Sequence, residues 1–453
     1  MEIILEWIIR FLVWLSRWAG LLSRCGIVQY DKWRPGKRLK LLLVGYNGAR
    51  NTGADARVVA LVDQLLEEFG NDKVEITVMT LNPANVRGYF PDCVNIYPFP
   101  TFFCWSLFRA ASAHHVALLC EGSTLTHTFA DALSMFFCQA AGIMKRQGKP
   151  CIAYGSDVTP LHRRLRRLTQ QMCTEVEFIA RSKPSLHALN DMGLRCSLGT
   201  DTAWTFRVPQ RYDQGRELLM QQGWDGQQRL LGVAVINPYC WPVRPSLLRW
   251  VKTIVTGKRK LQYDKMYFFS DSADRRRRYQ RYLSQVASAV KAYQAEHDAF
   301  VVIIGMEKLD TRACQDFRLL LAEYCAPGAR CALITSQDTP VFQMTSLLHC
   351  LDVLVTSRYH AAVLSMLKGM PIVAVSMDNR LKGLFTDIPA LEPHLHHVGE
   401  PDLANAIIRS LKEAESNRSA IIEATSQYVD ECRMKLKEMR AFTFKDIKGF
   451  GWF

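Results

Sequence analysis

Short, uninterrupted runs of apolar residues alternate along most of the chain with segments in which apolar residues recur every three or four positions. Runs of the first kind predict buried β-strands, and segments of the second kind predict helices. The runs fall at 39–45, 74–80, 116–120, 151–154 and 177–180, and again at 230–236, 300–304, 332–335, 353–356 and 372–375. Strands that are apolar throughout and alternate with helices are typical of a parallel sheet covered on both faces.

A polar stretch at 207–228 separates the two series of strands. We therefore predict an α/β fold of two doubly wound parallel-sheet domains, at 38–206 and 229–400, that face each other across a cleft. The helical segment at 401–453 is expected to brace one domain against the other. In such sheets ligands bind beyond the carboxyl ends of the strands, so the residues that follow each strand are the first candidates for a site.

The first 26 residues form a separate element that is rich in tryptophan, isoleucine and leucine. No stretch between Glu6 and Arg24 exceeds six residues without an ionisable residue, whereas a membrane span needs about 20 apolar residues. In a helix of this sequence the charges share an arc of roughly 80° and belong to Glu2, Glu6, Arg10, Arg17 and Arg24. We predict that 1–26 is an amphipathic helix lying in a membrane interface. The alternatives are docking on the protein's own surface, an oligomer contact and a true span.

Composition narrows the partners and the compartment. Lys and Arg number 57 against 43 Asp and Glu, a formal net charge of +14, which favours anionic partners such as phosphate, an acidic glycan or a membrane face. No motif that reads nucleic acid occurs, so we expect no nucleic acid. The 14 cysteines include no CxxC pair and no cysteine–histidine cluster at zinc spacing. That pattern is typical of reduced thiols in a cytoplasmic protein without a metal site.

The first strand ends in a glycine-rich turn at 45–55, in which Asn51, Gly53 and Asp55 open the next helix. Glycine lets the backbone approach a ligand closely, and the N–H groups at the start of a helix favour an anion. The turn is therefore a candidate binding site, although many strand–helix turns are glycine-rich for structural reasons.

Polar residues also follow the next strands. Glu121, Gly122 and Ser123 follow the run at 116–120, Asp157 lies just beyond the fourth run, and Arg181 follows the fifth. An arginine at such a position can clamp a carboxylate or phosphate, and a carboxylate can exchange protons with a hydroxyl. The alternative for the arginine is a surface side chain that caps a turn.

Ser357, Arg358 and His360 lie between a buried strand and a helix predicted at 361–368. Arg358 offers a bidentate fork, and His360 offers a proton near neutral pH. The start of the helix adds backbone N–H groups. Together these are the groups that an anionic substrate requires.

Taken in order, these strand ends resemble the polysaccharide pyruvyl transferase family over roughly residues 38–395. The matching positions are Asn51, Gly53, Asp55, Gly122, Ser123, Gly155, Pro160, Arg181, Ser185, Gly193, Thr200, Asp201, Ala203, Phe206, Ser357, Arg358, His360, Gly369 and Pro371. The resemblance implies a fold similar to the two-domain glycosyltransferase-B type. It also implies that phosphoenolpyruvate donates a pyruvyl group to a sugar, with phosphate as the leaving group.

The resemblance and the chemistry together suggest roles. Arg181 and Arg358 would bind the phosphate and carboxylate of the donor, and His360 would act as general acid toward its methylene carbon. Asp157 or Glu121 would handle the protons of the acceptor. The remaining substrate-binding candidates are Asn51, Gly53, Asp55, Gly122, Ser123 and Ser357. Phosphoenolpyruvate is a substrate in this scheme, so no cofactor and no metal are expected.

Two positions depart from the family pattern. Glu121 stands where a glycine is expected, and Lys183 does not supply the acid that commonly follows the family arginine. We expect a peripherally membrane-associated, cytoplasmic transferase that modifies a sugar of a cell-surface glycan or its lipid-linked precursor. The alternatives are a nucleotide-sugar-dependent glycosyltransferase of the same fold and a catalytically silent, membrane-docked scaffold.

Overall fold

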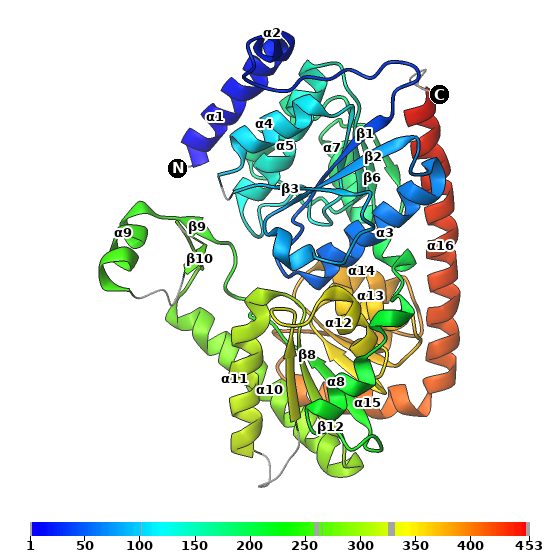
Figure 1. Ribbon diagram of the computed structural model, residues 1–453. Helices are drawn as coiled ribbons and strands as arrows, with labels where there is room; N and C mark the ends of the chain where they lie inside the picture. The colour runs from blue at the N-terminus through cyan, green and yellow to red at the C-terminus, as the bar shows by residue number, and fades with distance from the viewer. Residues whose placement is uncertain (1, 101, 258–261, 265, 325–330, 450–453) are drawn as a thin grey trace.

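The structure is a computed structural model that describes residues 2–100, 102–257, 262–264, 266–324 and 331–449. Two parallel sheets form the cores of two α/β domains, which are stacked one above the other in Figure 1. This is the predicted fold class, and it is confirmed. Each sheet is buried because its strands carry apolar residues on both faces.

The N-terminal domain contains a seven-stranded parallel sheet in the order β3-β2-β1-β4-β5-β6-β7. Its strands are β1 (Leu39–Val44), β2 (Val74–Thr80), β3 (Asn95–Pro98), β4 (Val116–Leu119), β5 (Cys151–Ser156), β6 (Val176–Ala180) and β7 (Cys196–Leu198). Successive residues of β1 point to opposite faces. Leu41 and Leu43 join the core on the side of α3 (Thr52–Phe69), and Leu42 joins the core beneath the other helices. Those helices are α4 (Cys104–Ala113), α5 (Asp131–Arg146), α6 (Arg163–Met172) and α7 (Lys183–Asp191).

The C-terminal domain contains a six-stranded parallel sheet in the order β13-β12-β8-β14-β15-β16. Its strands are β8 (Leu230–Ala234), β12 (Phe300–Gly305), β13 (Cys331–Thr335), β14 (Val353–Thr356), β15 (Ile372–Ser376) and β16 (Leu395–His397). One face is covered by α10 (Ala273–His297), α11 (Thr311–Tyr324) and α15 (Leu403–Ser416). The other is covered by α8 (Gly215–Gln221), α12 (Val341–Leu348), α13 (Tyr359–Met366) and α14 (Asn379–Thr386). The apolar cluster on this second face continues into the α3 side of the N-terminal domain.

The long helix α16 (Arg418–Gly449) runs along both domains, at the right of Figure 1. Near its start, Arg418 donates a hydrogen bond to the carbonyl of Asp352 in the C-terminal domain (2.8 Å). Near its end, the ring of Phe444 packs edge-on against Phe69 of α3, with ring centres 5.1 Å apart. Arg440 forms an ion pair with Glu67 (3.0 Å). The helix α16 therefore contacts both domains.

A small insertion leaves the C-terminal domain after β8. It consists of β9 (Arg244–Pro245), α9 (Leu247–Thr256), β10 (Gln262–Asp264) and β11 (Tyr267–Phe268), and its antiparallel strands lie in the order β10-β11-β9. In Figure 1 this insertion stands out to the left of both domains. Its base returns to the N-terminal domain, where the Val243 N–H donates to the carbonyl of Phe129 (2.9 Å).

The N-terminal segment forms α1 (Glu2–Leu15) and α2 (Ala19–Arg24), joined by a 3₁₀-turn, and α1 packs on α5 and α4. Ile9, Leu12 and Val13 are buried in that contact. The charged stripe also meets protein, because Glu6 accepts a hydrogen bond from Arg164 of α6 (2.6 Å) as well as from Arg10 (2.8 Å). One face of α1 is therefore docked on the chain itself. Among the described residues, no helix is long and apolar enough to cross a membrane.

The ten strands expected from the apolar runs all occur, each within two residues of its expected ends. The helix expected at 361–368 begins at Tyr359, so His360 lies in its first turn. The apolar runs did not predict the strands of the insertion. They also did not predict β3, β7 and β16, which lie at sheet edges. Edge strands are short and partly exposed, so they lack the continuous apolar run. Short 3₁₀-helices complete the chain: η1 (Ser16–Trp18), η2 (Pro83–Val86), η3 (Thr202–Thr205), η4 (Gln210–Tyr212), η5 (Lys308–Asp310) and η6 (Glu392–His394).

Replacing Phe444 tests how firmly α16 is attached to the N-terminal domain. Its side chain is 1% exposed, so Phe444→Ala should destabilise the fold by about 3–5 kcal/mol. Urea denaturation should show this as a lower midpoint. Phe442→Ala is the matched control, because Phe442 lies on the same helix and is 51% exposed. Equal midpoints for the two variants would contradict the attachment.

Candidate functional site at the domain interface

The candidate site lies where the carboxyl ends of the two sheets meet. The turn after β1 contacts the turn after β12: the Thr52 N–H donates to the carbonyl of Met306 (2.9 Å), and the Lys308 N–H donates to that of Arg50 (3.1 Å). Asn51 and Glu307 form an isolated antiparallel bridge between the same turns. Strand ends that are far apart in the sequence are thereby held at one interface.

Asp201 is the centre of this interface. Its side chain is fully buried, and its Oδ2 atom lies 2.7 Å from Arg181, 3.5 Å from Arg57 and 3.5 Å from His360 Nε2. Burial alone would raise the pKa of Asp201, but the neighbouring Arg57, His360 and Arg181 together lower it well below its usual value. Asp201 is therefore a carboxylate that joins two arginines of the N-terminal domain to His360 of the C-terminal domain.

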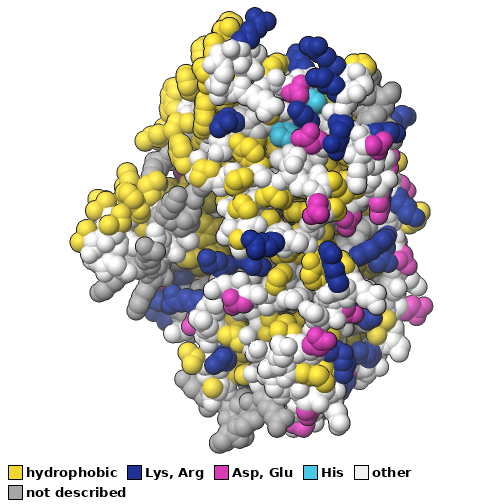
Figure 2. All heavy atoms as spheres, in the orientation of Figure 1, with side chains coloured by type: hydrophobic (Ala, Val, Ile, Leu, Met, Phe, Trp, Pro, Cys, Tyr) yellow, Lys and Arg dark blue, Asp and Glu magenta, His cyan; other side chains and the backbone are white. Residues whose placement is uncertain are grey.

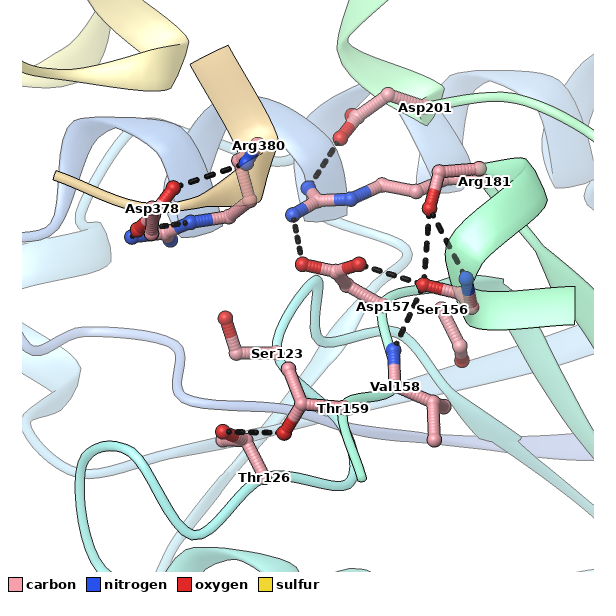
Figure 3. Close-up of polar contacts among 12 residues, drawn as sticks. Ser123, Thr126, Ser156, Asp157, Val158, Thr159, Arg181, Asp201, Asp378 and Arg380 are labelled. Atoms are coloured by element: carbon pink, nitrogen blue, oxygen red, sulfur yellow. Dashed lines mark hydrogen bonds and ion pairs between the residues drawn. The ribbon is translucent and has the colours of Figure 1, made fainter. Parts of the chain in front are cut away.

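Arg181 connects Asp201 to a second carboxylate. Its guanidinium also pairs with Asp157 (2.9 Å), as Figure 3 shows. Asp157 in turn accepts a hydrogen bond from Ser185 (2.6 Å). Burial raises the pKa of Asp157, but the charge of Arg181 and the Ser185 hydrogen bond leave it below its usual value. The ring of Tyr359 lies 4.7 Å from the Arg181 guanidinium carbon. Arg181 thus has fixed partners on three sides.

Glycine is required at two positions of this site. A Cβ on Gly53 would lie 2.0 Å from His360 Nδ1. A Cβ on Gly122 would lie 2.5 Å from Arg57 Nη1 and 2.9 Å from Arg181 Nη1. The sequence analysis gave both glycines a substrate-binding role. The structure shows that each makes room for a charged or titratable side chain.

Arg358 lies in the same region but points into the C-terminal domain. Its guanidinium binds the carboxylates of Asp310 (2.8 Å from Nε) and Glu307 (3.1 Å from Nη2). Burial raises the pKa of both acids, and the charge of Arg358 offsets that rise only in part. Ser357 is also occupied, since its hydroxyl lies 2.8 Å from the Tyr282 hydroxyl. In this structure Arg358 holds together the ends of β12 and β14.

The other candidates from the β1 and β4 ends mostly shape their own loops. Asn51 caps α3 by accepting the Ala54 N–H (3.1 Å). Asp55 is buried, accepts the Gly48 N–H (3.3 Å), and has its pKa raised to about 7 by burial. Glu121 accepts the backbone N–H groups of Tyr46 (3.3 Å) and Ser123 (3.4 Å).

Ser123 lies between the two halves of the site. Figure 3 shows its side chain on the side of Asp157 that faces Asp378 and Arg380 from the C-terminal domain. Arg380 pairs with Asp378 (2.9 Å from Nε) and lies over the ring of Phe129, 5.3 Å from its centre. Among the described residues, no group of three or more His, Cys, Asp or Glu side chains is arranged to hold a metal ion.

Arg57, Asp378 and Arg380 are among the interface residues that the sequence analysis does not identify, as are Glu307 and Asp310. Arg57 is fully buried in α3, where it donates to the carbonyls of Tyr154 (3.1 Å) and Gly155 (2.8 Å). A helical arginine normally indicates a solvent-facing position, so the sequence offers no signal for it. Asp378 and Arg380 follow β15. They could have been identified because ligands bind beyond the carboxyl ends of the strands in such sheets.

Comparison with known protein families identifies the family to which the chain belongs. The family profile described as polysaccharide pyruvyl transferase matches residues 51–379. The chain belongs to this family. The match includes both halves of the interface, from Asn51 to Asp378, and makes the protein a transferase. A search of curated protein sequences gives no significant match.

Solved structures support the fold independently of the family match. The chain is similar to a glycosyltransferase from Rickettsia africae ESF-5, with 8% identity, a TM-score of 0.54, and 91% of this chain and 98% of that chain covered. Sucrose-phosphate synthase from Thermosynechococcus elongatus has 11% identity and a TM-score of 0.53, with 91% and 99% covered. UDP-GlcNAc 2-epimerase from Methanocaldococcus jannaschii has 10% identity and a TM-score of 0.52, with 83% and 92% covered. These similarities show the glycosyltransferase-B-like fold.

The role of Asp201 can be tested by Asp201→Asn, which leaves the buried Arg57 and Arg181 without their shared anion. Breaking a buried ion pair on one side costs about 3–5 kcal/mol, measurable by urea denaturation at pH 7. Because the pKa of Asp201 is lowered in the folded state, its contribution is fully present above the ordinary value of 3.8 and is lost at lower pH. The difference between wild type and variant should therefore narrow as the pH falls below that value.

The matched control for this substitution is Asp191→Asn. Asp191 pairs with Arg166 at the surface and is 70% exposed, so its loss should cost at most about 1 kcal/mol. A difference between wild type and the Asp201 variant that does not change with pH would contradict the assignment of a charged Asp201.

Proposed function

We propose that the enzyme transfers a pyruvyl group from phosphoenolpyruvate to the hydroxyls of a sugar in a cell-surface glycan or its lipid-linked precursor. The observation that carries the proposal is the position of His360. It lies in the first turn of α13, 3.5 Å from Asp201, within the segment that matches the family. A titratable group thus stands at the interface where the N–H groups of a helix start also favour an anion.

The charges of the interface bear on how an anionic donor would bind. The cations Arg57, Arg181 and Arg380 are balanced by acids, of which Asp201 and Asp157 are the nearest to Arg181. Burial lowers the pKa of His360 below its usual value, and the opposing effect of Asp201 offsets this only in part. His360 is therefore neutral at pH 7, and a bound dianion or trianion would favour its protonation.

Protonated His360 can then deliver its proton to the methylene carbon of phosphoenolpyruvate. The resulting cation at the adjacent carbon is attacked by a sugar hydroxyl, and the hydroxyl proton passes to a carboxylate. Phosphate leaves, and a second hydroxyl can close a ketal. We assign Asp157 and Glu121 as the candidate carboxylates. Asp157 is charged at neutral pH, so it also stabilises the cationic intermediate.

The acceptor is expected to lie on a lipid carrier, with the protein bound peripherally to the cytoplasmic face of a membrane. Supporting this, the face of α1 that is not docked on the protein exposes large apolar side chains: Trp7 is 70% exposed and Phe11 56% exposed. Tryptophan at the rim of an apolar helix face is typical of elements that lie in a membrane interface.

The direct test measures phosphate release from phosphoenolpyruvate in the presence of candidate glycan acceptors. His360→Gln should lower kcat by about 10²–10⁴-fold, the usual contribution of a general acid, while the protein stays folded. His187→Gln is the matched control, because His187 is exposed on α7 of the other domain and should leave turnover unchanged. Full turnover by the His360 variant would contradict its role.

The same assay separates the alternatives. Release of a nucleoside diphosphate from a sugar nucleotide, with no phosphate from phosphoenolpyruvate, would indicate a glycosyltransferase. No turnover and no binding of either donor would indicate a scaffold. Glu121→Gly would then be the first substitution to test for a gain of activity.

Binding of phosphoenolpyruvate should also take up a proton at pH 7. The pKa of His360 is lowered in the free protein, so the histidine is mostly neutral there, and an anion beside it raises that pKa. Calorimetry in two buffers of different ionisation enthalpy measures the number of protons bound. The uptake should disappear in His360→Gln. Proton uptake that persists in this variant would place the titrating group elsewhere.

A further inference from the structure

The helix of the insertion, α9, exposes its apolar side to solvent. Leu248 is 87% exposed, Val255 79% and Ile254 62%, whereas Thr253 on the opposite side is buried. Leu247 and Val251 are also more than half exposed. An exposed face of this kind on a helix that stands away from the domains normally marks a contact with another phase or partner.

This face lies on the same side of the molecule as the exposed face of α1. Figure 1 places α1 and α9 along the left edge, one belonging to each domain, and Figure 2 shows hydrophobic side chains gathered over both. We call the exposed apolar residues of α1, α2, the 3₁₀-turn between them and α9 the apolar side: Ile3, Ile4, Trp7, Phe11, Trp14, Trp18, Leu21, Leu247, Leu248, Val251, Ile254 and Val255.

Basic residues border the apolar side. The guanidinium of Arg17 lies 4.9 Å from the ring centres of both Trp14 and Trp18. On α9, Arg249 and Lys252 are exposed next to the apolar face. With a net charge of +14, two copies of the chain would bring like charges together along this side. An anionic bilayer instead complements both the apolar surface and the basic rim.

We propose that the α9 insertion is a second membrane-contact element, and that α9 and α1 together seat the protein on an anionic bilayer. Each helix would lie parallel to the membrane with its apolar face in the interface, as the length of α9 is far too short to span. One element comes from each domain. The membrane would therefore contact both halves of the enzyme, not only its N-terminal helix.

The insertion is also joined to the domain interface at its base. The ring centre of Trp241 lies 5.0 Å from that of Phe129, the ring that also contacts Arg380. The hydroxyl of Tyr263 lies 2.7 Å from the hydroxyl of Tyr46. The insertion thus contacts the residues that follow β1 and β4, close to the candidate site. Lipid binding itself does not depend on the proposed pyruvyl transfer, so the two proposals can fail separately.

The test uses the full chain and sedimentation or flotation with vesicles of phosphatidylcholine, with and without phosphatidylglycerol. Leu248→Gln with Val255→Gln replaces two largely exposed apolar side chains, so partition onto the anionic vesicles should fall about tenfold or more. Trp7→Gln with Phe11→Gln should have a similar effect. Thermal denaturation followed by circular dichroism checks that each variant is folded, which is expected because these side chains lie at the surface.

The matched control is Met434→Gln with Phe442→Gln. Both residues are more than half exposed on α16, at the opposite edge of Figure 1, and should leave partition unchanged. Wild-type partition by the α9 variant would overturn the proposal. So would a wild-type dimer in analytical ultracentrifugation that the α9 variant converts to monomer, because a second copy would then cover this face.

Discussion

The rest of the interface depends on one interaction, the sharing of the buried carboxylate of Asp201 among two arginines and a histidine. A charge buried in a protein is tolerated only where partners replace its lost hydration. Here Arg57 and Arg181 come from the N-terminal domain and His360 from the C-terminal one. The same group that makes the interface stable thus also holds the histidine in place for chemistry.

The sheets supply this interface because parallel strands present all their carboxyl ends at one edge. The charged side chains can approach closely only because two nearby residues are glycines. Gly53 makes room for His360, and Gly122 makes room for Arg57 and Arg181. The departure at Glu121 fits the same picture. Its carboxylate accepts one backbone N–H from its own loop, at Ser123, and one from the turn after β1, at Tyr46, so the extra acid links the two neighbouring strand ends.

The sequence predicted the layered fold well, because buried parallel strands leave an apolar run that needs no knowledge of tertiary contacts. The candidate site was predicted as a set of strand ends but not as a network. Arg358 belongs to the strongest motif, yet its partners Glu307 and Asp310 follow a different strand, and only packing brings them together. Arg57 gave no signal because nothing local distinguishes a buried helical arginine from an exposed one. The segment 1–26, predicted as one helix, is broken by a 3₁₀-turn, and Glu6 of its charged stripe meets Arg164 of α6 and not only solvent.

The attachment of α16 to both domains limits how they can move. A rotation of one half away from the other would need a hinge between them. In this chain the ends of α16 are fastened to opposite halves, at Asp352 and at Phe69. A wide opening would have to bend the helix or release one end. The helix therefore opposes a wide separation of the two domains.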